Sequence, residues 1–183
     1  MQGGELPFQE VYAAFRPRVL RYVTRLVGEH DAEDLTQEIF VKIDQKARTF
    51  RGDAQLSTWV YRIATNAALD RLRSVSYRQE AQTGSLDESA ETDCGLIWQI
   101  DRSSSLEQQL MRQEMHQCFG RFVSDLPVNY RLVFVLSELE EMTNREIAEV
   151  LGLSVNTVKI RLHRGRSLLF QELRSHCTAE EWL

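Results

Sequence analysis

The chain has 183 residues, 43% of them hydrophobic, and a formal net charge of −5, which fits one large domain or two small ones with a buried core. Its apolar runs are too short to span a bilayer, and its start, MQGGELPFQE, lacks the basic and apolar segments of a secretory signal. The three cysteines, Cys94, Cys118 and Cys177, are widely spaced without a CxxC pair, so neither a zinc site nor a disulfide framework is expected. We therefore expect a cytoplasmic protein with no metal, no cofactor and no membrane insertion of its own.

Two helices are predicted in the first 47 residues. Apolar residues recur at helical spacing over 8–27, although Pro17 should kink or split this helix because it has no N–H. Gly28 ends the helix, and Asp31 is expected to cap the next one. The residues of that second helix predicted to face inward are Leu35, Ile39 and Ile43. The residues predicted on its other side are Asp34, Gln37, Glu38 and Val41.

A third helix is predicted to start at a cap on Ser57 or Thr58 and to run to about residue 73. Its predicted inner residues are Val60, Ile63, Ala64 and Ala67. Its predicted outer residues include Trp59, Arg62, Asn66, Asp70 and Arg73. An exposed Trp beside Arg and Asn suits stacking on unpaired bases, although a core position for Trp59 is the alternative.

Residues 74–105 change in character, being rich in Gly, Ser and acids without a sustained period, which is typical of a linker. An acidic linker avoids DNA, and the apolar patch Leu96–Ile100 within it suggests a docking surface that buries it. A helical pattern resumes over 106–123, and Pro127 marks the start of another apolar helix.

The stretch 143–172 has the layout of a helix-turn-helix. Thr143 and Glu146 form a capping box, Gly152 suits a left-handed helix end, and Ser154 caps the second helix. Val155, Val158 and Leu162 are predicted to line the inner face of that second helix, and small Ala148 to allow close approach. Gly165 inside the same helix costs about 1 kcal/mol relative to Ala, for which the sequence offers no reason.

The outward face of this second helix favours DNA binding. Arg and Lys can bond guanine, Asn can bond adenine, and an apolar side chain can contact a thymine methyl group. The alternative is a solvated basic face on an ordinary helical hairpin. Because the whole chain is acidic, it should bind duplex DNA weakly alone and need a partner. The outward residues are Asn156, Lys159, Ile160, Arg161, His163 and Arg164.

With these residues laid out, the chain resembles an extracytoplasmic-function sigma factor, a small bacterial transcription initiation factor. DAEDLTQEIFVKI (31–43) resembles region 2.2 of the family. FRGDAQLSTWVYRIATNAALDRLR (50–73) resembles regions 2.3 and 2.4, and 125–169 resembles region 4. The resemblance implies an all-α fold of two helical domains: region 2 at 1–74, an acidic linker at 75–105, region 4 at 106–175 and a tail at 176–183.

The resemblance also implies partners and contacts. Core RNA polymerase, through its β′ clamp helices and its β subunit, would bind the chain, with the linker threading towards the active-site cleft. An anti-sigma factor would mask the DNA-reading surfaces. The implied polymerase contacts are Asp34, Gln37 and Glu38. The implied contacts to a flipped base and the melted −10 strand are Phe50, Arg51, Gly52, Asp53, Thr58, Trp59, Arg62 and Asn66. The implied contacts to the −35 duplex are Ser154, Asn156, Thr157, Lys159, Ile160, Arg161, His163 and Arg164.

No nucleophile–base pair, phosphate-binding loop or metal cluster is visible in the sequence, so we expect no catalysis. Two other readings of the sequence remain open. One is a stand-alone helix-turn-helix regulator with a ligand-sensing N-terminal domain, which would bind duplex DNA tightly without polymerase. The other is a sigma-like interaction protein that does not read DNA.

Overall fold

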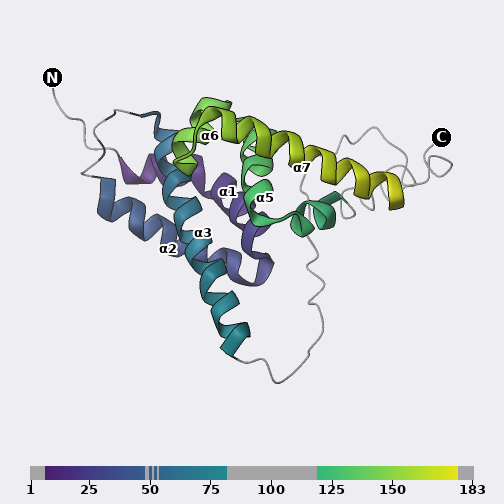
Figure 1. Cartoon of the computed structure of the whole chain (residues 1–183). Helices are drawn as coiled ribbons and strands as arrows, with labels where there is room; N and C mark the ends of the chain where they lie inside the picture. The colour runs from purple at the N-terminus through teal and green to yellow at the C-terminus, as the bar shows by residue number, and fades with distance from the viewer. Residues whose placement is uncertain (1–6, 48–49, 51, 53, 82–118, 177–183) are drawn as a thin grey trace, which may run out of the picture.

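The computed structural model describes residues 7–47, 50, 52, 54–81 and 119–176, and the regular elements in these ranges are all helical (Figure 1). Most of the linker expected at 75–105 and of the tail expected at 176–183 lies outside these ranges, as do residues 106–118. The elements are α1 (Phe8–Val27), α2 (Glu29–Ala47), α3 (Leu56–Ala81), α5 (Val128–Phe134), the π-helix η1 (Val135–Leu139), α6 (Asn144–Leu151) and α7 (Val155–His176). Residues 119–125 form a further helical segment.

Helices α1, α2 and α3 pack together as the first half of the molecule (Figure 1). Pro17 lies inside α1, which remains one helix over Phe8–Val27. Gly28 ends α1 with a φ of 87°, as predicted, and α2 then begins at once with Glu29. The prediction that Asp31 caps α2 is therefore wrong, because Asp31 already lies in the first helical turn.

The third helix also starts and ends differently from the prediction. It begins at Leu56, and the Trp59 N–H donates to the Gln55 carbonyl at 3.1 Å, so Ser57 and Thr58 are helical residues and not caps. It continues to Ala81, past the boundary expected at residue 74. The predicted inner face is confirmed, since its residues are all at most 8% exposed. They are Val60, Ile63, Ala64 and Ala67.

The second half is built from α5, η1, α6 and α7, with α7 crossing α5. At this crossing a Cβ on Gly165 would lie 3.4 Å from Tyr130 Cβ and 3.6 Å from the Tyr130 carbonyl oxygen. An added Cβ would therefore be in ordinary contact with α5, and the crossing leaves little room for a side chain that extends beyond a Cβ. In η1 the Glu140 N–H donates to the Val135 carbonyl at 3.1 Å, a five-residue step wider than that of an α-helix.

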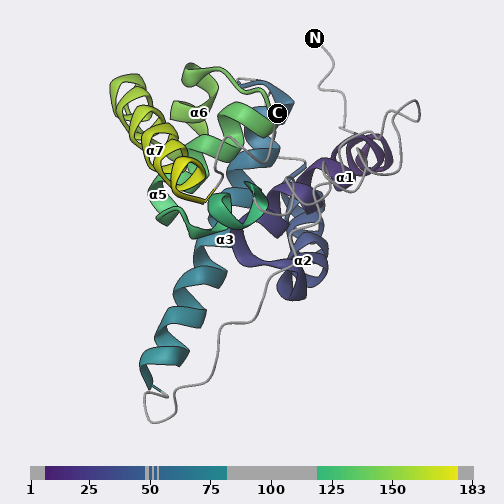
Figure 2. The same ribbon diagram turned by 90° about the vertical axis from the view of Figure 1, so that its right-hand side faces the viewer.

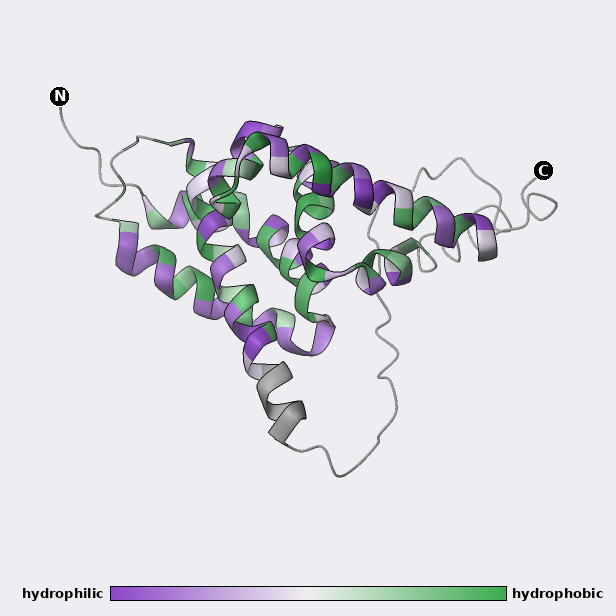
Figure 3. Cartoon of the chain, viewed as in Figure 1, coloured by the Kyte–Doolittle hydropathy of each residue, from purple (hydrophilic) through white to green (hydrophobic). Residues whose placement is uncertain are grey.

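The two halves pack against each other and share one continuous set of buried residues. Helix α6 lies on α3, and α1 contacts α5 and η1. Figure 2 shows α6 and α7 seated beside the upper part of α3, while the lower part of α3 projects away from the other helices. Figure 3 shows hydrophilic residues recurring along α2 and α7 and hydrophobic ones gathering where helices cross. Among the described residues, no helix is long and apolar enough to cross a membrane.

Candidate nucleic-acid interface

The turn of the helix-turn-helix is fixed by local hydrogen bonds. The Thr143 N–H donates to Glu146 Oε2 at 2.8 Å, and the Glu146 N–H donates to Thr143 Oγ1 at 3.3 Å, which completes the predicted capping box. Gly152 adopts a left-handed φ of 64°. Ser154 Oγ accepts the Thr157 N–H at 3.1 Å, and the two hydroxyls lie 2.8 Å apart. Ser154 and Thr157 thus set the start of α7.

The outward face of α7 carries the other side chains predicted to read the −35 element. Val158 and Leu162 are buried beneath it as predicted, whereas Val155 is 37% exposed. The prediction that Val155 lies inside is wrong, because it is the first residue of α7 and precedes the part that packs. Arg161 is half-buried, and the other five residues are exposed. They are Asn156, Lys159, Ile160, His163 and Arg164.

The basic residues of this face are not neutralised. No described acidic side chain pairs with Lys159, Arg161 or Arg164, whereas Arg166 on the same helix pairs with Glu138. The first three cations are therefore available to phosphates or guanine edges. Because their helix is capped at its start by Ser154, their spacing is fixed before any ligand arrives.

The residues predicted to hold the −10 strand are only partly brought together. Phe50 and Trp59 are in ring contact, with centroids 5.2 Å apart, and Trp59 lines a recess with Arg62 and Asn66, which are exposed. Thr58 is 0% exposed and its hydroxyl has no partner among the described residues, so it lies beneath this surface. Gly52 is exposed with a φ of 76°. Arg51 and Asp53 lie outside the described residues.

This recess, of about 290 Å³, also contains two lysines that the sequence reading missed. Lys42 and Lys46 come from α2 and face Trp59, Arg62 and Asn66 of α3 across it. Their spacing of four residues places them on one face of α2, which is the only sequence signal that would have found them. Asp70 also lines the recess and pairs with Arg73 at 3.4 Å. The three cations outnumber this carboxylate, and with an amide and an aromatic ring they suit a nucleic-acid strand, whose phosphates need positive charge and whose bases need a stacking surface.

A second recess, of about 590 Å³, also lies along α2 and shares Lys42 with the first. It is lined by Asp34, Gln37 and Glu38, the predicted polymerase contacts, and by Val41, which is 57% exposed. The structure thus brings the three predicted residues together on one open surface with an apolar side chain among them.

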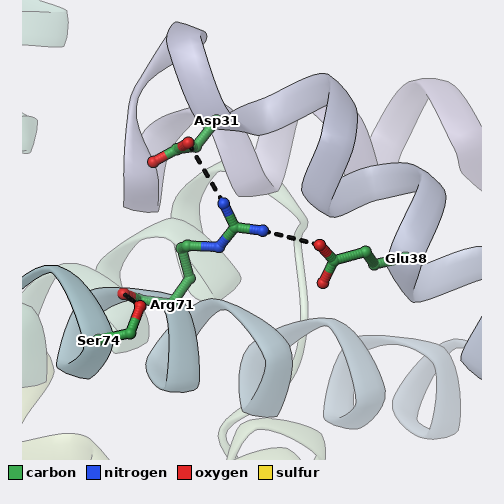
Figure 4. A network of polar contacts seen from close by, with 4 residues as sticks. All are labelled: Asp31, Glu38, Arg71 and Ser74. Atoms are coloured by element: carbon green, nitrogen blue, oxygen red, sulfur yellow. Dashed lines mark hydrogen bonds and ion pairs between the residues drawn. The ribbon is translucent and has the colours of Figure 1, made fainter.

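Arg71 of α3 also lines this recess and was missed by the sequence reading. Figure 4 shows its guanidinium between two carboxylates of α2, with Nη1 lying 3.3 Å from Asp31 Oδ1 and Nη2 lying 2.8 Å from Glu38 Oε1. Ser74 donates to the Arg71 carbonyl at 2.8 Å. One planar cation therefore holds Glu38 in a defined orientation and ties α2 to α3.

Comparison with known proteins identifies the two halves. The family description Sigma-70 region 2 matches residues 11–77, and Sigma-70, region 4 matches residues 116–169. The chain is 29% identical over 191 residues to the ECF RNA polymerase sigma factor SigW of Bacillus subtilis, covering 94% of this chain and 92% of that protein. It is 29% identical over 168 residues to the ECF RNA polymerase sigma-E factor of Escherichia coli K12, covering 92% of this chain and 87% of that protein.

Solved structures share the fold. The sigma factor RpoE of Bartonella quintana, in complex with the anti-sigma factor NepR, superposes with a TM-score of 0.73 at 21% identity, covering 93% of this chain and 98% of that one. CnrH, in complex with the cytosolic domain of CnrY, superposes with a TM-score of 0.63 at 24% identity, covering 96% of this chain and 92% of that one.

In the described residues the regular elements are all helical, with a helix-turn-helix in the second half and another polar surface on α2 and α3, which is the layout of a two-part DNA-binding protein. The two family matches together span well over half of the chain. The chain belongs to the sigma-70 family of transcription initiation factors. Within this family it is an extracytoplasmic-function sigma factor, which directs RNA polymerase to promoters. The match to region 2 disfavours both a stand-alone regulator and a sigma-like protein that does not read DNA.

Proposed function

We propose that three surfaces of this chain divide the work of promoter recognition. The outward face of α7 reads the −35 element as duplex. The recess between α2 and α3 holds the −10 element as a single strand, and the recess around Glu38 docks on core RNA polymerase. The observation that carries the proposal is the fixed, unneutralised basic face of α7.

At the −35 element, α7 would lie in the major groove. Lys159 and Arg164 are both exposed and lie five residues apart along α7. They would contact guanine edges or phosphates. Ile160 is 46% exposed and would contact a thymine methyl group. Ser154 and Thr157 would act mainly by positioning the helix, since their hydroxyls are already engaged with each other.

At the −10 element, the recess would take the non-template strand after melting. Trp59, supported by Phe50, offers a ring on which an unpaired base can stack. Lys42, Lys46 and Arg62 surround it with positive charge for the phosphates. A flipped base presents its Watson–Crick edge to side chains, and exposed Asn66 has both a donor and an acceptor to read it.

On the polymerase side, Asp34, Gln37 and Glu38 would contact the β′ clamp helices, and the second half of the chain would contact the β subunit. Val41 adds apolar area to a surface that is otherwise polar, which is the usual anatomy of a protein–protein interface. The Arg71 bridge orients Glu38 for this contact.

We further propose an anti-sigma partner, cytoplasmic location and no chemistry of the chain's own. RpoE and CnrH, which share its fold, were each solved with another protein, NepR or CnrY, which supports the first of these. The side chains of the three surfaces bind and position nucleic acid or protein, and none of the contacts described above requires a bond to be made or broken.

Run-off transcription with core polymerase on a promoter library tests the proposal. The chain should select a defined pair of promoter elements, and Lys159→Ala should lower initiation at the preferred −35 sequence by about 10- to 100-fold, the discrimination that one base-specific contact provides. The matched control is Arg166→Ala on the same helix, whose guanidinium pairs with Glu138 and whose loss should change initiation by less than about threefold. Absence of promoter-selective initiation by the unaltered chain would refute the proposal.

A further inference from the structure

The charged residues of α2 change sign along one side of the helix. Asp34, Glu38, Lys42 and Lys46 follow one another at intervals of four residues, a spacing at which neighbouring side chains on a helix meet. The two acids line the recess proposed to dock on polymerase, and the two lysines line the recess proposed to hold the −10 strand. One helix therefore carries an anionic and a cationic binding surface that adjoin each other.

Lys42 lies at the boundary of the two surfaces, because it lines both recesses. Glu38 precedes it by four residues, and a glutamate in that position has the favourable order for an ion pair along a helix. Yet among the described residues no carboxylate pairs with Lys42. The ion pair that the sequence favours is therefore absent, and another contact must account for its absence.

Arg71 of α3 holds the carboxylate that Lys42 would otherwise meet. Its Nη2 lies 2.8 Å from Glu38 Oε1, and its Nη1 lies 3.3 Å from Asp31 Oδ1. Figure 4 shows the Glu38 carboxylate facing this guanidinium across the gap between the two helices. Charge-assisted hydrogen bonds from one planar cation to two carboxylates fix the orientation of all three groups. Glu38 is thus directed towards α3 and not along α2.

The other carboxylates that share a recess with Lys42 do not neutralise it either. Asp70 lines the strand recess and pairs with Arg73 at 3.4 Å. Asp34 lies eight residues before Lys42, which is about 12 Å along the helix axis. Arginines of α3 therefore occupy both carboxylates whose positions would allow them to compete for the Lys42 ammonium.

We propose that Arg71 is a positioning residue for the −10 strand, although it does not line the recess that holds the strand. By holding Glu38, it leaves the Lys42 ammonium available to a phosphate. The proposal rests on the proposed function for the identity of the two recesses. Without Arg71, Glu38 would turn along α2 and pair with Lys42, and the strand would have to break that pair before Lys42 could neutralise a phosphate. One arginine thereby prevents two adjoining surfaces of opposite charge from neutralising each other.

Fluorescence anisotropy of a labelled single strand, titrated with the full chain at low salt, tests this role. The probe is the non-template −10 strand of a promoter selected in the run-off experiment, and polymerase is omitted so that none of its groups competes for Glu38. Arg71→Gln should weaken binding about two- to fourfold, the effect of one partly exposed ion pair. It should also lower the slope of log affinity against log salt by up to about 0.7, the value of one phosphate on a single strand.

Rescue by a second substitution separates this role from a loss of structure. Glu38→Gln added to Arg71→Gln should restore the strand affinity of Glu38→Gln alone, because a neutral amide does not neutralise Lys42. Disturbed packing of α3 on α2 would not be repaired by removing a second member of the bridge. In a chain that carries Lys42→Ala, Arg71→Gln should weaken strand binding no further.

Arg16→Gln is the matched control. It removes the same charge from another bridge to α2, in which Arg16 Nη2 lies 3.0 Å from Glu33 Oε2. Glu33 lines neither recess, so strand affinity should change by less than about 1.5-fold.

The inference is overturned if Arg71→Gln behaves like Arg16→Gln, if Glu38→Gln fails to restore the affinity, or if Lys42→Ala does not abolish the effect. It is also overturned if the unaltered chain does not bind the strand. Promoter-selective initiation with polymerase is a separate measurement. Its failure refutes the proposed function and this inference with it, whereas successful initiation combined with any of the results above refutes the role of Arg71 alone.

Discussion

Gly165 provides a test of how closely α7 and α5 approach, because two substitutions at one site should have opposite signs. A Cβ at residue 165 would lie 3.4 Å from Tyr130 Cβ and 3.6 Å from the Tyr130 carbonyl oxygen, both ordinary contact distances. Gly165→Ala therefore fits without displacing α5 and should recover most of the helix propensity lost at glycine, stabilising the chain by about 0.5–1 kcal/mol. That corresponds to a rise of roughly 1–4 °C in the melting temperature for a chain of this size.

Gly165→Val should instead destabilise. Its two Cγ atoms extend beyond a position already in contact with the α5 backbone, so the helices must move apart, and overpacking of this kind costs about 1–3 kcal/mol. Thermal and urea unfolding of the three chains, followed by circular dichroism, measures both effects. Equal stability of the Ala and Val variants, or destabilisation by Ala of more than about 1 kcal/mol, would refute the proposed geometry of the crossing.

Three further predictions concern stability and function. Burial raises the pKa of Glu140, so the folded chain binds a proton at this group more readily than the unfolded chain does. The free energy of unfolding should therefore be greatest below the ordinary carboxyl pKa and fall as pH rises through the raised pKa, and Glu140→Gln should flatten this dependence in urea unfolding at several pH values. Arg71→Gln should weaken polymerase binding about two- to fivefold, the effect of a partly exposed pair. Combined with Glu38→Gln it should weaken binding no more than Glu38→Gln does alone, and full additivity in a titration by fluorescence anisotropy would contradict the Arg71–Glu38 bridge. Lys46→Ala should weaken the binding of a −10 single strand to polymerase that carries this chain. The salt dependence of that binding should fall by about one phosphate contact, and an unchanged dependence would contradict the role proposed for the α2–α3 recess.

The parts of the fold predicted correctly from sequence are those whose signals are local. Thr143, Glu146, Gly152 and Ser154 specify the helix-turn-helix within twelve residues, and the structure confirms each cap. The buried faces of α2 and α3 follow from helical periodicity in the same way.

The misses arose where the determining contact is distant in sequence or where two local signals compete. Asp31 has the side chain of a cap, but Gly28 ends α1 so abruptly that α2 starts first, and Asp31 pairs with Arg71 instead. The limit on side-chain size at Gly165 could not be predicted, because it is set by Tyr130, thirty-five residues earlier in the chain.

The candidate surfaces show the same division. The exposed residues of α7 could be predicted because they share one helix face. Lys42, Lys46 and Arg71 were missed because each lines a recess whose other residues come from a different helix. The pairing of Tyr61 with Glu140 spans 79 positions, and no periodicity within either segment indicates it.

The π-helix η1 makes the orientation of Glu140 depend on residue count. Its five-residue step accommodates one residue more than an α-helical turn would, and each residue of a regular helix turns the chain by about 100°. Removing a single position between Val135 and Leu139 would therefore swing the following carboxylate away from the Tyr61 hydroxyl and rotate α6 relative to α3, on which it packs. The number of residues in η1 thus sets the register in which the two halves of the molecule meet.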